Sequence, residues 1–308
     1  MRVSIVVAVR GNNDALKGLS QAIGAQDWPT TDLEVIVVDN HPTPVLPPAH
    51  NRPGQPTYRV VHERRAGLSR ARNTGIAHAN GQVILITDPD ARPEPSWISR
   101  MVRALENTGA YCAGGRVEAH FTDDSTSTDV PPDVLQLFVP PTWPQTTTKL
   151  VAPYWVVGCN LAIRRDPPPR FDTHLGVTGN RHLSCEELEL TVRAQQDGHL
   201  VVVVPDAVVH RAIHPTDLTP AAIRSRAYWH GVSVARLLAI HPDADIYDSY
   251  RLRDALTPAR LRTRAGRTSA VADIARVLGL QAERLLLATA RLTSKTTDEA
   301  TKEKALHG

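Results

Sequence analysis

The first 110 residues alternate between short apolar runs and helix-length amphipathic stretches, and this alternation constrains the fold more than any other feature. Val3–Val9 is apolar except for Ser4, as expected for a strand that is covered on both faces. The predicted strands are Val3–Val9, Glu34–Val38, Tyr58–His62 and Gln82–Thr87, and the predicted helices are Ala15–Ala25, Ser69–Ala79 and Pro95–Thr108. This order predicts an α/β fold with a mostly parallel central sheet and helices on both faces.

The remainder of the chain has weaker patterns. Residues 123–148 are rich in Thr, Ser, Asp and Pro, which predicts a long surface excursion. Regular structure is predicted again over Tyr154–Arg164. A helix is predicted over Cys185–Asp197, a strand over Leu200–Val204 and a second helix over Pro220–Ala239. We predict one domain over residues 1–240, with halves 1–118 and 119–240, and a helical C-terminal extension over 241–308 with a frayed polar end.

Composition and charge argue against several classes of protein. No stretch of about 18 uncharged apolar residues is present, so no transmembrane helix is predicted. The opening MRVSIVVAVRGNN lacks a small-residue cleavage site and is interpreted as a strand rather than a signal peptide. Cys112, Cys159 and Cys185 form no C-x-x-C pair, which argues against a disulfide framework or a structural zinc site. A net charge of +3 does not indicate nucleic-acid binding, and we expect a cytoplasmic protein.

Polar residues follow several predicted strands. Asp39-Asn40 follows the second strand, Asp88-Pro89-Asp90 the fourth, and His210 the last, while residues 114–116 (Gly-Gly-Arg) follow another apolar segment. In an open parallel sheet, ligands bind beyond the carboxyl ends of the strands. The sequence therefore predicts that one edge of the sheet collects these side chains in a ligand site.

Asp88 and Asp90 form a D-x-D pair at this edge. Two carboxylates at such spacing suit one divalent cation whose other ligands are diphosphate oxygens, because Mg²⁺ and Mn²⁺ prefer oxygen donors. An ordinary turn is the alternative, since Asp and Pro are frequent turn residues.

Other polar candidates also have structural alternatives. Asp39 suits a hydrogen bond to a nucleobase or ribose, or a turn. Glu186 and Glu187 open a helix, where the dipole favours ionised carboxylates, so either offers a general base, or both simply stabilise the helix. His210 and His214 suit a metal or a phosphate, or are ordinary surface residues.

Longer segments resemble family 2 glycosyltransferases of the GT-A fold. VSIVVAVRGNNDALKGLSQAIGAQDWPTTDLEVIVVDN is similar to their opening, and GLSRARNTGIAHANGQVILITDPDARPEPSW to their central signature. GCNLAIRRD, FDTHLGV and CEELELTVRAQQDGHLVVVVPDAVVHR follow in the order of their acceptor-side segments. The resemblance extends from about residue 2 to residue 240. It implies a Rossmann-like fold with a nucleotide-sugar-binding half over 1–118 and an acceptor-binding half over 119–240.

The resemblance implies a metal-dependent, inverting transfer of a sugar from a nucleotide diphosphate sugar, with UDP as the expected nucleotide. The residues at donor-binding positions are Val9, Asp39, Arg70, Asn73, Asp88 and Asp90. Asp90 and His210 stand where the family holds Mn²⁺ or Mg²⁺. Glu187 stands where the family has its catalytic Asp and is expected to act as the general base, with Glu186 beside it.

Several features depart from the family pattern. Glu187 is one methylene longer than Asp, and Pro89 stands where another acid is frequent. The Q-x-x-R-W motif of processive synthases is absent, which favours transfer of a single sugar over polymer synthesis. Glu187 and the Ser184-Cys185 pair favour an alternative, a non-catalytic nucleotide-binding partner or regulator. The absence of G-x-G-x-x-G after the first strand argues against a dinucleotide-dependent enzyme or a nucleotidyltransferase.

The acceptor is not specified by the sequence, and a natural product, a glycan and a lipid-linked intermediate all stay open. Trp143, Tyr154 and Trp155 suit stacking on an acceptor ring or packing in the core. The Arg-bearing amphipathic stretch Ile274–Leu292 suits contact with an anionic membrane surface, a homodimer helix or a brace within the chain.

Overall fold

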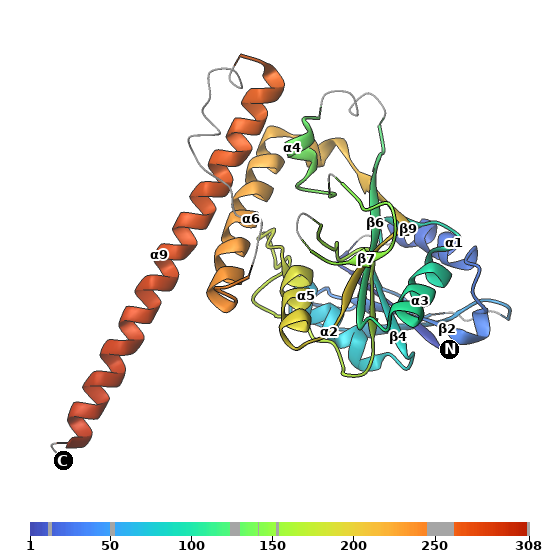
Figure 1. The fold of residues 1–308 in the computed structure, drawn as a ribbon, viewed down its shortest axis with the longest axis horizontal. Coiled ribbons are helices and arrows are strands. Elements are labelled where there is room, and N and C mark those ends of the chain that lie inside the picture. The colour runs from blue at the N-terminus through green and yellow to red at the C-terminus, as the bar shows by residue number, and fades with distance from the viewer. Residues whose placement is uncertain are drawn as a thin grey trace.

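The protein is described by a computed structural model of residues 1–308 (Figure 1). The structure describes residues 1–11, 14–49, 53–123, 130–140, 142–151, 154–244 and 262–306, without the side chains of residues 14, 264 and 291–306. Parts of the predicted surface excursion (124–129 and 141) and of the predicted extension (245–261) lie outside this description. The predicted domain boundaries therefore stay predictions.

The described strands form one sheet in the order β3-β2-β1-β4-β8-β6-β9-β5, with β7 also on β9. The strands are β1 Val3–Val9, β2 Leu33–Asp39, β3 Thr57–His62, β4 Val83–Thr87, β5 Ala91–Pro93, β6 Cys112–Phe121, β7 Thr148–Lys149, β8 Leu161–Arg164 and β9 Val201–Ile213. The first four strands are parallel, as predicted. Beyond β4 the sheet is mixed, because β8 runs antiparallel to both β4 and β6, whereas β6 and β9 are parallel.

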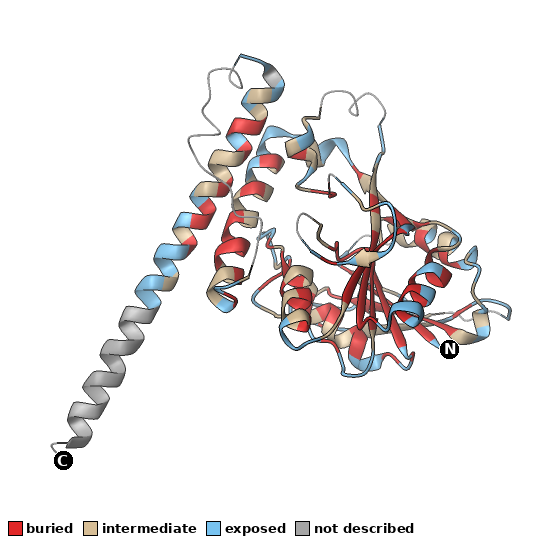
Figure 2. Cartoon of the chain, in the orientation of Figure 1, coloured by how far each residue is buried: buried red, intermediate tan, exposed pale blue. Residues whose placement is uncertain are grey.

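Helices cover both faces of the sheet, which confirms the predicted layers (Figure 1). The helices are α1 Asp14–Gly24, α2 Leu68–His78, α3 Trp97–Thr108, α4 Pro132–Leu135, α5 Glu186–Gln196, α6 Pro220–Ile240 and α9 Arg264–Leu306. Apolar residues of α1 and α3 share one core cluster with the sheet, and those of α2 and α5 share the other. Figure 2 shows the buried residues concentrated along the strands and on the sheet-facing sides of the helices.

Glycines near the middle of β6 correct one expectation. Residues 114–116 do not follow a strand but lie inside β6. A Cβ atom at Gly114 would overlap the side chain of Val156, and one at Gly115 would overlap Asn160 and the Ala207 carbonyl. The two glycines therefore permit close packing across the sheet instead of ending a strand.

A bulge makes β9 longer than the predicted strand over 200–204. In the pairing with β6, Val204 lies opposite Gly115 and Val208 lies opposite Arg116, so residues 205–207 have no partner in the ladder. Such a bulge inserts residues without ending the strand. Because β9 continues to Ile213, His210 lies inside a strand and not after one.

The Asn160 side chain fills the interruption at this bulge. Its Nδ2 donates to the carbonyls of Arg116 (2.7 Å) and Ala207 (2.8 Å), and its Oδ1 accepts from Trp97 Nε1 (2.7 Å). Asn160 and Trp97 are both fully buried. An unpaired buried polar group costs about 1–3 kcal/mol. By pairing with both carbonyls, this single amide removes that cost at the bulge.

The C-terminal helix α9 packs along α6 (Figure 1). Gly231 of α6 lies against the backbone at Arg276, and Gly279 of α9 lies against the backbone at Tyr228, so neither site has room for a methyl group. Arg236 Nε and Glu283 Oε1 add an ion pair at 2.8 Å. Within the described part of the chain, no helix combines the length and apolar character needed to cross a bilayer.

We expect Gly279→Ala to weaken the packing of α9 on α6, because the new Cβ meets backbone atoms that cannot rotate away. The free energy of unfolding should fall by about 1–3 kcal/mol, the usual cost of overpacking. Urea denaturation measures this change. Gly24→Ala is the matched control, since a Cβ there meets nothing within 4 Å. Equal stability of the two variants would contradict the close contact between the helices.

Candidate active site

One buried arginine joins the acidic segments of the site. Arg72 lies on α2 with only 2% of its side chain exposed, and its Nη2 lies 3.1 Å from Asp88 Oδ1. Its Nη1 lies 2.8 Å from Glu186 Oε1, and its guanidinium lies 5.4 Å from the centroid of the Phe171 ring. Burial opposes the charge of this group, but Asp88 and Glu186 outweigh burial and raise the pKa of Arg72. The Arg72 guanidinium therefore holds Asp88 and Glu186, which are distant in sequence, close together.

The sequence analysis missed Arg72, although a signal was present. Ser69, Arg72 and Ile76 recur at the spacing of one helix face, and all three are buried. An arginine on the inner face of a predicted helix needs a buried acidic partner, and the acids of this chain were already candidates.

Arg70 and Asn73 lie apart from this acidic cluster. The Asn73 side chain pairs with the backbone of Phe171, donating from Nδ2 to its carbonyl (2.9 Å) and accepting at Oδ1 from its amide (2.8 Å). Arg70 and Asn73 line a separate pocket with Arg65 and Arg170. The structure does not bring them to the D-x-D pair, and their roles in donor binding stay predictions.

Asp39 and Val9 are paired neighbours at the ends of β2 and β1. The Asp39 carboxylate accepts hydrogen bonds from the amides of Val45 (2.6 Å), Leu46 (2.9 Å) and His41 (3.1 Å). Burial alone would raise the pKa of Asp39, but these hydrogen bonds outweigh burial and lower it. The structure thus shows Asp39 anchoring the loop after β2, and its contact with a nucleotide stays a prediction.

Asp88 and Asp90 lie on the turn after β4, as predicted. The His210 ring lies 3.4 Å from Glu94 Oε1 and 3.7 Å from Glu118 Oε2. In the described structure His210 is thus paired with two glutamates, and its sharing of a cation with Asp90 stays a prediction.

Arg211 lines the same cavity as Asp88. Burial opposes its charge, but attraction from neighbouring groups that include Asp88 and Asp90 raises the pKa of Arg211. Burial raises the pKa of Asp90, and repulsion from Asp88 adds to this, while Arg211 opposes it. Among the described residues, no group of three or more His, Cys, Asp or Glu side chains is arranged to hold a metal ion.

The two glutamates begin α5 but point to different partners. Glu186 is buried against Arg72, whereas Glu187 Oε1 accepts a hydrogen bond from the Gly158 amide at 3.2 Å. The second oxygen of each carboxylate is buried, and neither has a hydrogen-bond partner among the described residues. Burial raises the pKa of Glu186, and Glu187 adds to this, while Arg72 lowers it. One oxygen of Glu186 is thus tied to the ion-pair network, and one oxygen of Glu187 is held by the Gly158 amide.

The backbone before these glutamates is strained. Cys185 has φ 68°, and it is the only residue other than glycine with positive φ in the described part of the chain. A side chain in this left-handed conformation costs of order 1 kcal/mol and persists only where the surroundings hold it. Cys185 is buried in a cluster with Val234 and Leu280, so α6 and α9 fix the start of the helix that carries Glu187.

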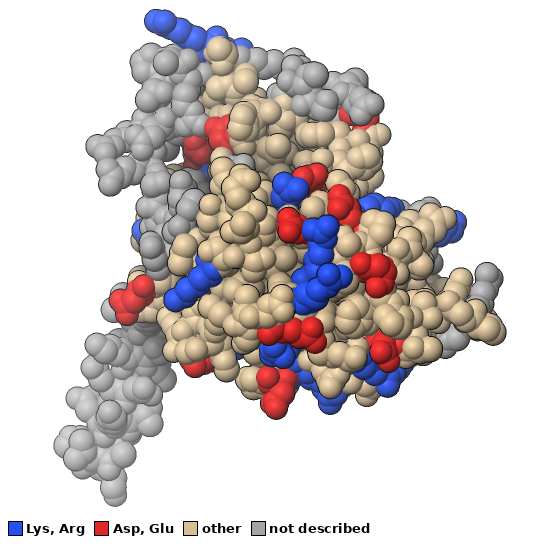
Figure 3. All heavy atoms as spheres, turned by 45° about the vertical axis from the view of Figure 1, so that its right-hand side comes forward, with Lys and Arg blue, Asp and Glu red and all other residues tan. Residues whose placement is uncertain are grey.

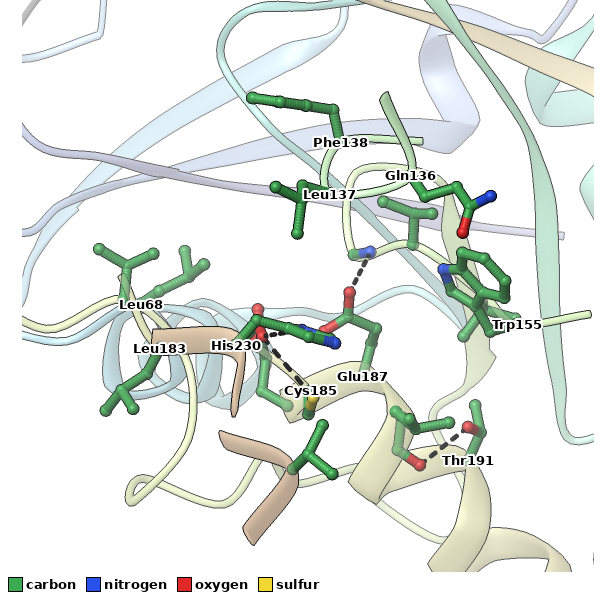
Figure 4. A pocket seen from close by; sticks show the side chains of 18 of the residues that line it. Leu68, Gln136, Leu137, Phe138, Trp155, Leu183, Cys185, Glu187, Thr191 and His230 are labelled. Atoms are coloured by element: carbon green, nitrogen blue, oxygen red, sulfur yellow. Dashed lines mark hydrogen bonds between the residues drawn. The ribbon is translucent and has the colours of Figure 1, made fainter. Parts of the chain in front are cut away.

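A cavity of about 310 Å³ lies in front of Glu187 (Figure 4). Most of its wall is apolar and includes Leu68, Leu137, Phe138, Leu150, Trp155 and Leu183. Its polar lining includes Asp88, Arg211, Arg226 and His230. The His230 Nδ1 lies 3.1 Å from Ser184 Oγ, and burial, followed by Arg276 and Arg226, lowers the pKa of His230 to about 3. Its ring is therefore neutral at physiological pH.

Comparison with known proteins identifies the family. The description "Glycosyl transferase family 2" matches residues 4–159, slightly more than half of the chain. The chain belongs to this family. Membership in this family, together with relatives that are named as transferases, supports a glycosyltransferase enzyme over the non-catalytic alternative.

Two curated relatives come from Haloferax volcanii. Glycosyltransferase AglE is 26% identical over 130 residues, which span 41% of this chain and 43% of AglE, less than half of that protein's length. Glucosyl-dolichyl phosphate glucuronosyltransferase is 25% identical over 281 residues, covering 82% of this chain and 83% of the relative. Both are named as sugar transferases, and the second match extends well beyond the region matched by the family description.

A solved structure shows the same fold. Mannosyltransferase PcManGT from Pyrobaculum calidifontis, in complex with GDP-Man and Mn²⁺, superposes with a TM-score of 0.53 at 18% identity, covering 97% of this chain and 79% of that chain. The fold of this glycosyltransferase is therefore of the GT-A type, as the sequence resemblance implied.

The structure brings some of the predicted acids together with arginines that were not predicted. Asp88 and Glu187 line one cavity, and Asp90 follows Asp88 on the turn after β4, while their roles stay predictions. Arg72, Arg211 and Arg226 were not predicted. In Figure 3, acidic and basic side chains of the described residues lie intermixed on the visible face.

We expect Gly158→Ala to displace Arg72, because the new Cβ would lie 2.6 Å from both of its terminal nitrogens. A free arginine would swing aside, but Asp88 and Glu186 hold this one. Since misplacing groups at a reacting centre by about 1 Å costs on the order of 10²-fold, the transfer rate should fall by about 10–10²-fold. Steady-state transfer assays of purified, folded protein measure it. Gly24→Ala is the control, and an unchanged rate in Gly158→Ala would contradict the role given to Arg72.

Proposed function

We propose that the protein transfers a single sugar from a nucleotide diphosphate sugar, a UDP-sugar, to a discrete acceptor with inversion at the anomeric carbon, and that Glu187 is the general base. One observation carries this proposal. Glu187 projects into the cavity with Oε1 fixed by the Gly158 amide, while Oε2 has no partner among the described residues (Figure 4). A carboxylate oxygen that is positioned but unoccupied is what a general base requires.

In the proposed reaction, Glu187 Oε2 accepts the proton of an acceptor hydroxyl. The acceptor oxygen forms a bond to the anomeric carbon on one face of the sugar, while the bond to the diphosphate oxygen breaks on the opposite face. Holding both substrates in one cavity converts a bimolecular step into an effectively unimolecular one. Positioned general-base help adds about 10²–10⁴-fold.

The donor set near Asp90 fits a divalent cation, Mn²⁺ or Mg²⁺. The protein offers carboxylate oxygens at Asp88 and Asp90, and Arg72 already holds one oxygen of Asp88. Mg²⁺ is commonly bound by one or two carboxylates together with substrate phosphates, so a site with few protein ligands is consistent with it. When bound, such a cation would stabilise negative charge on the diphosphate.

The cavity supports an acceptor with an apolar part. Part of its wall is aliphatic and aromatic, beside a charged part, and covering apolar surface gains roughly 25 cal/mol per Å². A relative that aligns with most of the chain is named for a dolichyl phosphate sugar. Among the three acceptor classes left open by the sequence, these observations favour a lipid-linked intermediate.

We expect Glu187→Gln to reduce the transfer rate by about 10²–10⁴-fold, because glutamine keeps the size of the side chain but cannot accept the proton. Donor binding should stay within about twofold of wild type. Transfer assays and calorimetric titration with the active donor measure these two effects. Glu106→Gln, an exposed glutamate on α3, is the matched control. Wild-type transfer by Glu187→Gln would remove the catalytic assignment.

Asp90→Asn tests the proposed cation site separately from the proposed general base, Glu187. Loss of one carboxylate charge should weaken the Mn²⁺-dependent part of nucleoside diphosphate binding by about tenfold or more, in line with a charge-assisted interaction. Titration with UDP, GDP and dTDP, each with Mn²⁺ and with EDTA, measures this and also tests UDP as the donor nucleotide. Equal metal dependence in Asp90→Asn and wild type would argue against a cation at Asp90.

A further inference from the structure

Two arginines that belong to different elements converge on one short segment of the cavity wall. Arg211 comes from β9 and Arg226 from α6. Arg211 Nη1 donates to the carbonyl of Phe138 at 3.1 Å, and Arg226 Nη1 donates to the carbonyl of Leu137 at 3.5 Å. The Arg226 guanidinium also stacks on the Phe138 ring, 4.3 Å from its centroid. Both guanidinium groups are thus held in place on the lining of the cavity.

These two cations have no direct anionic partner in the described part of the chain. Neither forms an ion pair within 4.0 Å there, and their hydrogen bonds go to neutral carbonyls. The two positive charges are close, since they donate to the carbonyls of adjacent residues. Burial, followed by repulsion from Arg211, lowers the pKa of Arg226 to about 10. Because placing unpaired charges in a poorly hydrated site is unfavourable, an anion that enters the cavity would relieve this cost.

The nearby carboxylates offset the arginines only at longer range. Asp88 and Asp90 attract both arginines, Glu187 attracts Arg211, and Asp217 attracts Arg226. None of these acids forms an ion pair with either arginine in the described part of the chain, and Asp88 is already paired with Arg72. The two fixed guanidinium groups therefore match a dianionic group such as a diphosphate.

Resting on the proposed function, we infer that Arg211 and Arg226 form an anion subsite for the diphosphate of the donor, which binds it even without a divalent cation. Each guanidinium presents a planar set of N–H donors that matches phosphate oxygens. The stack on Phe138 and the bonds to the carbonyls of residues 137 and 138 use only part of these donors. His210, for which the sequence predicted contact with a metal or a phosphate, lies on the opposite side of the same strand from Arg211.

Inorganic pyrophosphate is the probe, because it carries the diphosphate without a nucleobase or a sugar. Calorimetric titration of the full chain in EDTA should show binding by wild type. Arg226→Gln and Arg211→Gln should each weaken it by about tenfold or more, since hydrogen bonds between charged groups are the strong ones. Arg226→Lys should weaken it less, because the charge remains. Arg224→Gln, an exposed arginine on the same helix, should bind as wild type does.

Other results overturn the inference. Pyrophosphate binding that requires Mn²⁺ and is equal in wild type, Arg226→Gln and Arg211→Gln would show that the cation alone holds the diphosphate. Normal pyrophosphate affinity with a raised acceptor KM in both glutamine variants would place the anion on the acceptor instead. Urea denaturation of each variant confirms that a loss of binding is not a loss of folding.

Failure of this inference is distinguishable from failure of the proposed function. Glu187→Gln should bind pyrophosphate as wild type does, whatever its transfer rate. A protein that transfers sugar but fails to bind pyrophosphate in EDTA would keep the catalytic assignment and lose the subsite.

Discussion

The buried ion pairs of Arg72 are the interaction on which the site depends. The guanidinium joins Asp88, at the end of β4, to Glu186, at the start of α5, although these residues are almost 100 positions apart. Removing one partner of a buried ion pair costs about 3–5 kcal/mol, because the remaining charge is left uncompensated. Gly158 leaves the space that Arg72 occupies, and Phe171 covers it. The end of β4 and the start of α5 therefore meet at a single positive charge.

The ion pairs of Arg72 orient the adjacent residues Glu186 and Glu187 toward different partners. Consecutive residues on a helix point about 100° apart, so when Glu186 turns to Arg72, Glu187 turns to the cavity. The longer glutamate side chain is steadied by the Gly158 amide, the residue that also borders Arg72. The departure from the usual aspartate is thus accompanied by a hydrogen bond that fixes where the extra methylene places the carboxylate.

The C-terminal helix contributes to the site from a distance. α9 contacts α6 through Gly231 and Gly279 and through the Arg236–Glu283 ion pair. α6 in turn brings Arg226 and His230 to the cavity. The structure shows this tail packed on α6 within the chain. Its roles as a brace for a lid, in contact with a membrane or in contact with a second copy stay predictions.

The sequence by itself determined the local part of this protein. Buried strands alternating with amphipathic helices are readable from periodicity, and they place Asp88 and Asp90 at the end of β4 and the glutamates at the start of α5. Only the tertiary structure decided which side chains meet. Arg72 acquires its role from acids far away in sequence, which no local pattern specifies. On β9, residues 205–207 have no partner, and this odd number reverses which face each later residue occupies. Arg211 lines the cavity, and His210 lies on the other face of the strand beside Glu94 and Glu118, because the register of a bulged strand is fixed by its neighbour and not by its own sequence.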